Sequence, residues 1–241
     1  EHAKNGFTQT SYEVLNNNTQ QKSILECACP IEVIPYPIVE HEEVDLDLEL
    51  KTSFNFLTIA LLGPRKNIEK SVEWFLEEFK DDPDVGLIIK TSRAKNSLLD
   101  RDFTRKFLKG IRSKYKSSKC KLYLLHGSLS NDEIHSLINH KSVKAYYSTT
   151  HGEGFGLPMF EAAYSGLPVV ATDWSSHPEF LTAPYKENGK VKNKKLFARI
   201  EYDLAEIYPQ AVWEPLIIKG SRWAYPKKTS VKQQLRKVYK N

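Results

Sequence analysis

Two glutamates flank a glycine-rich stretch in the second half of the chain. Glu153 and Glu161 stand on either side of Gly154 and Gly156, and Pro158 suits the first turn of a helix. Free backbone N–H groups at a helix start bind anions, and a diphosphate fits that place better than a metal ion. A carboxylate accepts two hydroxyl hydrogens from a vicinal diol, such as those of ribose and hexoses. The spacing therefore predicts a site for a phosphate-linked sugar.

Each part of this pattern also has a structural interpretation. The glycines, with Gly152 before them, are expected to permit unusual backbone angles, yet a glycine-rich connector of no function would look the same. Glu161 could be a solvated helix residue near the favourable end of the helix dipole. Its neighbours Phe160 and Ala162 indicate packing instead, so the binding interpretation is preferred.

The surrounding sequence predicts alternating strands and helices that would position these residues. Five short apolar runs predict strands at 54–62, 85–89, 121–125, 144–148 and 168–172. Helices are predicted after Asn67 as a cap, from Ser97, from the capping box Ser130-x-x-Glu133, and near Pro158. This alternation predicts an α/β fold with an open, mostly parallel, Rossmann-like sheet and helices on both faces.

In such sheets, ligands bind at the carboxyl ends of the strands. Four loops follow predicted strands there: 63–67, 126–128, 149–156 and 173–176. The loop that contains Glu153 is the richest in glycine and charge. Residues 1–25 are polar, two prolines interrupt the apolar segment 31–37, and 40–49 is acidic, so the first 50 residues read as a linker.

Composition excludes several classes of protein. With 241 residues, 40% hydrophobic and 27% charged, the chain is globular, and no apolar run approaches the roughly 20 residues of a spanning helix. The net charge is +5, but the lysines are spread along the chain, with local clusters at 186–195 and 227–240. These clusters are expected to be solvated faces, with contact to an anionic ligand or membrane surface as the alternative. Nucleic acid is not expected as a partner, because aromatic residues do not alternate with these charges.

The cysteines and acidic pairs give no metal site. The chain has an odd number of cysteines, Cys27, Cys29 and Cys120, which favours a reducing compartment. The protein is therefore expected to be cytoplasmic, and it could also contact a membrane peripherally. Cys27-x-Cys29 lacks a second ligand pair at zinc spacing. Asp45-x-Asp47 lies in the acidic run and is expected to be solvated.

The run from His151 to Asp173 resembles the Glu-x7-Glu signature of retaining GT-B glycosyltransferases, the group called family 4 or group 1. The match includes the two glutamates, the Gly-Phe-Gly between them, and a Gly-x-Pro turn into an apolar strand. Asp173-Trp174-Ser175 and Trp223-Ala224-x-Pro226 resemble a subgroup with tryptophan-containing loops. Ser176 stands where that subgroup has glycine.

The resemblance implies a donor-binding, C-terminal half of a GT-B fold. It implies transfer of a sugar from a nucleotide donor to an acceptor hydroxyl with retention, as in hexosyltransferases, without metal or other cofactor. Residues 1–7 resemble the end of an acceptor-binding domain, so 1–50 would be its remnant with the linker and 51–241 the donor-binding domain. An acceptor domain is then expected upstream. The donor is expected to be UDP- or GDP-linked, and the acceptor a glycan, lipid or small molecule.

The resemblance also implies roles for single residues. Lys66 and Glu153 would be catalytic: Lys66 would stabilise charge on the leaving diphosphate, and Glu153 would bind hydroxyls of the donor sugar. Glu161 would hold the ribose, and His126 would be a polar loop residue without a catalytic role. The other expected donor-binding residues are Gly63, Arg65, Gly127, Gly154, Phe155, Gly156 and Leu157.

Two other functions use similar residues. A non-catalytic nucleotide-sugar-binding module would keep Glu161 and the glycines but show no turnover. A glycoside hydrolase also needs two carboxylates, but they flank a scissile bond, and a pair around a helix N-terminus suits a diphosphate donor better.

Overall fold

The computed structural model describes residues 9–16, 19–26, 34, 36–94, 96–214 and 216–241, so Cys27 and Cys29 lie outside the described residues. The chain divides into two units, residues 1–40 and 41–241. In the first unit, β1 (Gln9–Asn16) and β2 (Thr19–Glu26) pair in antiparallel register. The sequence did not predict this pairing, because the segment is polar and lacks a clear apolar alternation. The assignment of residues 1–50 to a remnant and linker stays a prediction.

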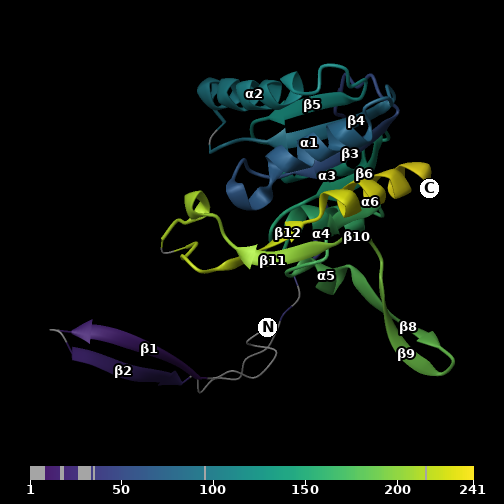
Figure 1. Ribbon diagram of the computed structural model, residues 1–241. Coiled ribbons are helices and arrows are strands. Elements are labelled where there is room, and N and C mark those ends of the chain that lie inside the picture. Colours follow the sequence, from purple (N-terminus) through teal and green to yellow (C-terminus); the bar gives the residue numbers. More distant parts are fainter. Residues whose placement is uncertain (1–8, 17–18, 27–33, 35, 95, 215) are drawn as a thin grey trace. The chain divides into compact units, whose positions relative to one another are not determined.

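The second unit is built on a six-stranded sheet whose strands are all parallel, in the order β10-β7-β6-β3-β4-β5 (Figure 1). The strands are β3 (Phe54–Ile59), β4 (Val85–Thr91), β5 (Lys121–His126), β6 (Val143–Ser148), β7 (Val169–Thr172) and β10 (Ala198–Ile200). The first five confirm the strands predicted from apolar runs. The edge strand β10 was not predicted, because three residues are too few to show a pattern.

Helices cover both faces of this sheet. On one face, Phe56 of β3 belongs to a buried core with α1 (Ile68–Glu78), α2 (Leu98–Ser113) and α6 (Lys228–Lys240). On the other, Leu57 packs in a core with α3 (Asn131–Asn139) and α4 (Leu157–Tyr164), next to the short α5 (His177–Phe180). Successive residues of a strand point to opposite faces, so β3 contributes to both cores. The predicted α/β class is confirmed.

The helix starts follow the predicted chemistry with one exception. Ser97 accepts a hydrogen bond from the backbone of Asp100, and the capping box of Ser130 and Glu133 is complete. Asn67 precedes α1 in the left-handed conformation (φ 55°) and does not cap it with its side chain. Its amide instead donates to the backbone and hydroxyl oxygens of Thr149, at 3.2 and 3.1 Å. Asn67 therefore ties the loop after β3 to the loop after β6.

Two antiparallel strand pairs and two 3-10 turns complete the second unit, as far as its residues are described. The β8 (Thr182–Glu187) and β9 (Lys190–Lys195) strands form an exposed hairpin that projects from the domain in Figure 1. Asn188 and Gly189 both have positive φ, as a two-residue type I′ turn requires. A second pair joins β11 (Tyr202–Glu206) to β12 (Arg222–Pro226). The turns are η1 (Pro64–Lys66) and η2 (Pro209–Ala211).

Part of the acidic segment belongs to the second unit. Leu46, Leu48 and Leu50 pack against the core under α3 and α4, and Val44 N–H donates to the Ser136 hydroxyl at 2.8 Å. Alternate leucines thus turn inward while the carboxylates between them stay exposed. Residues 41–50 are attached to the sheet domain more closely than a linker is.

Candidate functional site

Lys66, Arg65 and Glu153 come together at the carboxyl edge of the sheet. Because β3 pairs directly with β6, the loops that follow these two strands are neighbours. The Lys66 ammonium lies 2.6 Å from each carboxylate oxygen of Glu153. The Arg65 guanidinium donates to Glu153 at 2.9 Å and also to the carbonyl of Gly152. Three predicted site residues therefore form one ion cluster.

This cluster fixes the charge of Glu153. Only 10% of the Glu153 side chain is exposed, and burial by itself acts to raise its pKa. The hydrogen bonds and charges of Lys66, followed by those of Arg65, outweigh burial and hold the pKa of Glu153 below its ordinary value. Glu153 is therefore an ionised carboxylate, and a ligand that binds here meets two cations already held in place.

Serine hydroxyls from the loop after β7 support the backbone around Glu153. Ser175, with φ of 80°, accepts from the Glu153 N–H at 3.0 Å and donates to the Glu153 carbonyl at 2.5 Å. The Ser176 hydroxyl lies 3.1 Å from the Glu153 carbonyl and 2.9 Å from that of Phe155. Sequence analysis noted Ser176 only as a departure from glycine. Compared with the glycine of that subgroup, Ser176 adds a hydroxyl that contacts these two carbonyl oxygens.

The glycines differ from one another in what they permit. Of Gly152, Gly154 and Gly156, only Gly156 has positive φ (92°), and it is the N-cap of α4. The expectation of unusual angles at all three is therefore wrong for Gly152 and Gly154. A Cβ at Gly154 would meet nothing within 4 Å, so packing does not require glycine there. The Phe155 ring packs on Phe160 and Phe180, with centroids 5.3 and 5.2 Å away.

Glu161 lies in the second turn of α4 and is partly buried. Within the described part of the chain, its carboxylate has no hydrogen bond or ion pair. Burial raises the pKa of Glu161, and the charges of His41 and His135 oppose that shift. A half-buried carboxylate without a partner suits a group that accepts hydrogen bonds from a ligand. Leu157, the first residue of the helix, is also partly buried.

Gly127, in the loop after β5, has no space for a side chain. Gly127 has φ of 107°, and a Cβ there would lie 2.5 Å from the amide oxygen of Asn96. Its carbonyl accepts from the ammonium of Lys90, whose pKa burial lowers against the opposing charge of Glu133. The sequence did not single out Lys90, because a lysine that ends an apolar strand looks like a solvated residue. A Cβ at Gly63, after β3, would be unobstructed.

His126 has a structural partner. Its Nε2 lies 2.9 Å from the Asp100 carboxylate, and the two side chains are 4% and 7% exposed. Asp100 also accepts from the backbone N–H groups of Arg93 and Ala94. This pairing joins the start of α2 to the end of β5, so His126 is a strand residue with a buried side chain and not the polar loop residue that the sequence predicts.

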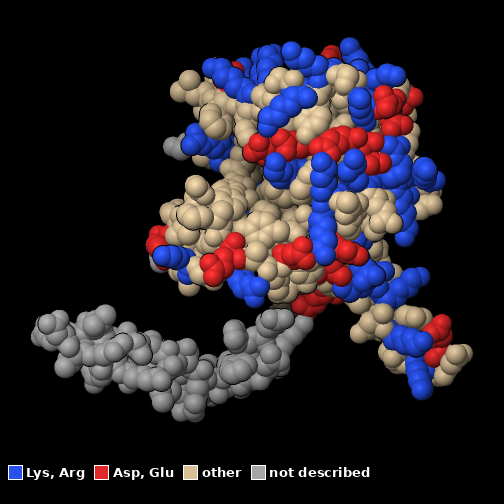
Figure 2. All heavy atoms as spheres, in the orientation of Figure 1, with Lys and Arg blue, Asp and Glu red and all other residues tan. Residues whose placement is uncertain are grey.

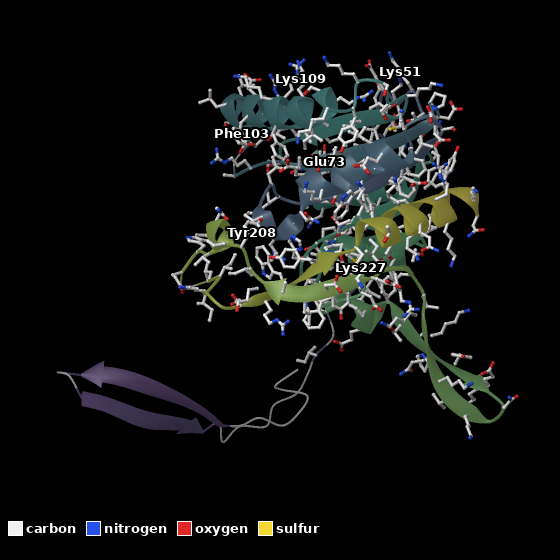
Figure 3. All side chains as sticks on the ribbon, in the orientation of Figure 1. Lys51, Glu73, Phe103, Lys109, Tyr208 and Lys227 are labelled. Atoms are coloured by element: carbon white, nitrogen blue, oxygen red, sulfur yellow. The ribbon has the colours of Figure 1, made fainter. Side chains whose placement is uncertain are left out.

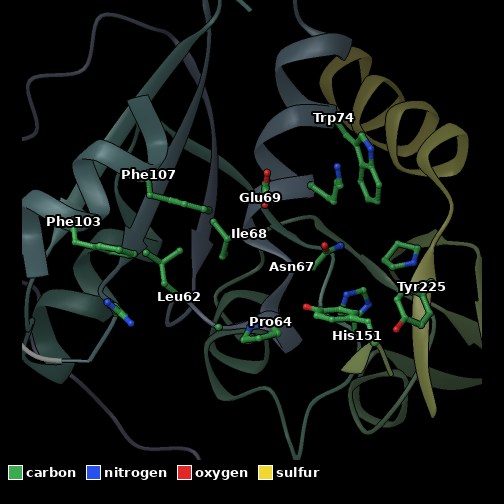
Figure 4. Close-up of a pocket in the computed structure, with 15 residues that line it drawn as sticks. Leu62, Pro64, Asn67, Ile68, Glu69, Trp74, Phe103, Phe107, His151 and Tyr225 are labelled. Atoms are coloured by element: carbon green, nitrogen blue, oxygen red, sulfur yellow. The ribbon is translucent and has the colours of Figure 1, made fainter. Parts of the chain in front are cut away.

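A cavity of about 700 Å³ adjoins the loop after β3 (Figure 4). Pro64, Asn67 and His151 line it, whereas Lys66, Glu153 and Glu161 do not. Five of its other lining residues are aromatic and come from α1, α2 and the β11–β12 region: Trp74, Phe103, Phe107, Tyr208 and Tyr225. The sequence gives no indication of this cavity, because its residues are dispersed between positions 62 and 226.

Among the described residues, no group of three or more His, Cys, Asp or Glu side chains could hold a metal ion. No helix in that part of the chain is long and apolar enough to cross a bilayer.

Comparison with known proteins identifies the family. The sequence model of the glycosyl transferases group 1 family matches residues 47–198, more than half of the chain. The GtfA subunit of a UDP-N-acetylglucosamine–peptide N-acetylglucosaminyltransferase of Streptococcus parasanguinis is 26% identical over 146 residues, covering 58% of this chain and 25% of that protein. A glycosyltransferase from Rickettsia africae shares the fold, with a TM-score of 0.50 and 12% identity over 80% of this chain and 39% of that one. The C-terminal domain of a group 1 protein (LpcC) from Francisella tularensis has a TM-score of 0.43 and 20% identity, covering 53% of this chain and 62% of that one. The chain belongs to the glycosyl transferases group 1 family.

Proposed function

We propose that residues 51–241 bind a nucleotide sugar at the carboxyl edge of the sheet and present its sugar for transfer to an acceptor hydroxyl with retention. The observation that carries this proposal is the ion cluster of Lys66, Arg65 and Glu153 beside the start of α4. Cations and a helix N-terminus together suit a diphosphate, while a carboxylate suits sugar hydroxyls. Family membership supports the same reaction class.

The cationic and anionic side chains would contact different parts of the donor. Lys66 and Arg65 would contact the diphosphate, where Lys66 stabilises the negative charge that builds up as the bond to the sugar breaks. Glu153 would accept hydrogen bonds from sugar hydroxyls, and the backbone from Gly154 to Leu157 would meet the phosphates. Glu161 would accept the ribose hydroxyls, for which its unpaired carboxylate is suited. A UDP-linked hexose derivative is the first donor to test, because the Streptococcus relative is named for one.

Whole-protein activity requires more than this domain. The chain covers 25% of the length of the Streptococcus relative and 39% of the Rickettsia protein. We propose that the domain works opposite an acceptor-binding domain, as GT-B enzymes do. We also propose that the lysine-rich hairpin of β8 and β9 contacts an anionic membrane surface, because its five lysines are exposed or partly exposed on two strands (Figure 2).

A binding module without catalysis is the second candidate. The paired state of Glu153 favours it, because a carboxylate neutralised by two cations also forms a stable anion-binding loop. Turnover separates the two functions. If the domain binds nucleotide sugars but neither transfers nor hydrolyses the sugar, even with an acceptor-binding domain supplied, it is a non-catalytic binding module.

Calorimetric titration with UDP-, GDP- and ADP-linked sugars and the free nucleotides tests donor binding. Lys66→Ala should weaken binding of the preferred nucleotide by about tenfold or more, since it removes a charged hydrogen bond. Lys109→Ala, an exposed lysine on α2, is the matched control and should leave affinity unchanged. Absence of binding to every nucleotide in the panel would exclude the proposed function, as would equal affinities of the two variants.

A further inference from the structure

The cavity beside the loop after β3 has walls suited to a ring-shaped ligand. Its volume of about 700 Å³ lies within the range of ligand pockets. Figure 4 shows Phe103 and Phe107 on one side and Trp74, Tyr225 and His151 on the other. Tyr208, from the loop after β11, also lines the cavity. Figure 3 shows Tyr208 and Phe103 on the same side of the domain. Aromatic faces on two sides leave room for a ligand between them.

His151 gives this cavity a fixed hydrogen-bond acceptor. Its Nδ1 lies 2.7 Å from the Ala224 carbonyl oxygen, which only accepts, so Nδ1 carries the proton. Burial lowers the pKa of His151, against the opposing bond to Ala224, so the ring is neutral and Nε2 has a free lone pair. His151 is 5% exposed, and among the described residues Nε2 has no hydrogen-bond partner.

Packing holds the His151 ring in one orientation. It stacks on Trp223, with centroids 5.1 Å apart and planes 11° apart, and contacts Tyr225 at 4.7 Å. The backbone of His151 is fixed as well, because its N–H donates to the Arg65 carbonyl and its carbonyl accepts from Ala224. Nε2 is not among the fully buried side-chain atoms, so it is open to a donor in the cavity, either water or a hydroxyl of a ligand that displaces the water.

Charged side chains on the cavity wall indicate that the ligand carries polar groups. Glu69 and Lys70, on the first turn of α1, and Arg93, which lies 4.5 Å over the Phe103 ring, join the aromatic residues. Lys70 pairs with Glu73 at 2.7 Å and Glu69 with Lys114 at 3.6 Å, but an alkyl chain would offer no hydrogen bond to His151. A sugar ring offers C–H groups to an aromatic face and hydroxyls around its edge, so it matches both kinds of wall.

We propose that this cavity binds a saccharide unit of the acceptor, with a hydroxyl donating to His151 Nε2 and Tyr208 packing against the ring. The inference rests on the proposed sugar transfer for the identity of the ligand as an acceptor. It uses a separate set of side chains from the donor site. The two sites share two loops: Gly63 and Pro64 line the cavity in the loop that carries Lys66, and His151 lines it in the loop that carries Glu153.

Calorimetry of the chain with a panel of sugars tests the site. The probes are glucose, galactose, mannose, N-acetylglucosamine and their common disaccharides at millimolar concentration, each measured with and without UDP. Tyr208→Ala should weaken the saccharide that binds by about tenfold, as removal of a central aromatic contact does. Tyr185→Ala is the matched control, because Tyr185 has similar exposure (39% against 37%) but lies on the β8–β9 hairpin.

A second variant protects the test against misfolding, since Tyr208 also contacts Trp223. Phe103 is 45% exposed on α2, and Phe103→Ala should weaken saccharide binding while Leu99→Ala on the same helix does not. No saccharide binding, or unchanged affinity in both cavity variants, would overturn the inference. Loss of UDP affinity in these variants would also overturn it, by making the cavity part of the donor site. If saccharide binds but no nucleotide does, the cavity stands as a saccharide site and the proposed donor function fails.

Discussion

The Lys66 ammonium lies 2.6 Å from both carboxylate oxygens of Glu153, although 87 positions separate the two residues in sequence. Arg65 adds a second cation to the same carboxylate. A donor diphosphate bound as proposed would therefore share these cations with Glu153. The same contact that positions the cations also competes with the ligand for them.

Glu153→Gln separates these two effects. Removing the negative charge frees Lys66 and Arg65, so affinity for UDP alone should rise severalfold. The UDP-sugar should gain less affinity over UDP than it does in wild type, because the hydroxyls of the sugar lose their charged acceptor. Turnover should drop by about a hundredfold or more if Glu153 orders the reacting sugar. Calorimetry with UDP and the UDP-sugar measures the first effect. Glu201→Gln, an exposed glutamate, serves as the control, and unchanged UDP affinity in Glu153→Gln would contradict the competition.

Glu161→Ala should act through the ribose. The variant should lose about tenfold in affinity for a ribonucleotide, because a charged acceptor for two hydroxyls is removed. Affinity for the matching 2′-deoxynucleotide should change much less, since part of the diol is already absent. The measurement is the ratio of the two affinities in wild type and variant. An equal loss for both nucleotides would place Glu161 outside the ribose site.

The same residue predicts a pH-dependent change in stability. The folded-state pKa of Glu161 is raised by burial, so its favourable contribution is present below the ordinary carboxyl pKa and is lost as pH rises through the folded value. At about pH 7 wild type therefore buries an unfavourable charge, and Glu161→Gln should melt about a few degrees higher. The difference should shrink toward about pH 4. Thermal unfolding at both pH values checks the sign, and a lower melting temperature for Glu161→Gln at neutral pH would contradict it.

Charge reversal tests the β8–β9 hairpin as a membrane contact. The double variant of Lys190→Glu and Lys194→Glu should reduce binding to phosphatidylserine-containing vesicles by about tenfold or more, at roughly 1 kcal/mol for each lysine near the surface. The matched control reverses two exposed lysines on α6, Lys237 and Lys240. Sedimentation with these vesicles and with neutral phosphatidylcholine vesicles measures the effect. Equal losses in both double variants would indicate a general effect of net charge and not a contact by the hairpin.

Much of the sheet was predictable because buried parallel strands read as apolar runs. β3 and β4 are nearly buried throughout, and their burial is what the sequence shows. β8 and β9 are exposed on both faces, so their lysines give no alternation, and only Asn188-Gly189 indicates a hairpin. The left-handed Asn67 was misread as a side-chain cap because its partner, Thr149, is remote in sequence.

The candidate site was predictable where motif and loop coincide. Glu153 and Lys66 follow strands directly, so their approach depends only on which strands are neighbours. His151 lies within the motif, but the sequence predicts no role for it, because its environment comes from Ala224 and Trp223, more than seventy residues away. Tertiary contacts of this kind leave no local pattern to read.

The sheet consists of two halves, each continuous in sequence: β3–β4–β5 and β6–β7–β10, which meet where β3 pairs with β6. A donor held by Lys66 on one half and Glu161 on the other would connect them. Binding should therefore suppress transient opening along this junction, because opening would break contacts to the ligand on one side. Slower amide hydrogen exchange in β3 and β6, with little change at the outer strands β5 and β10, is the signature of a ligand that joins the halves.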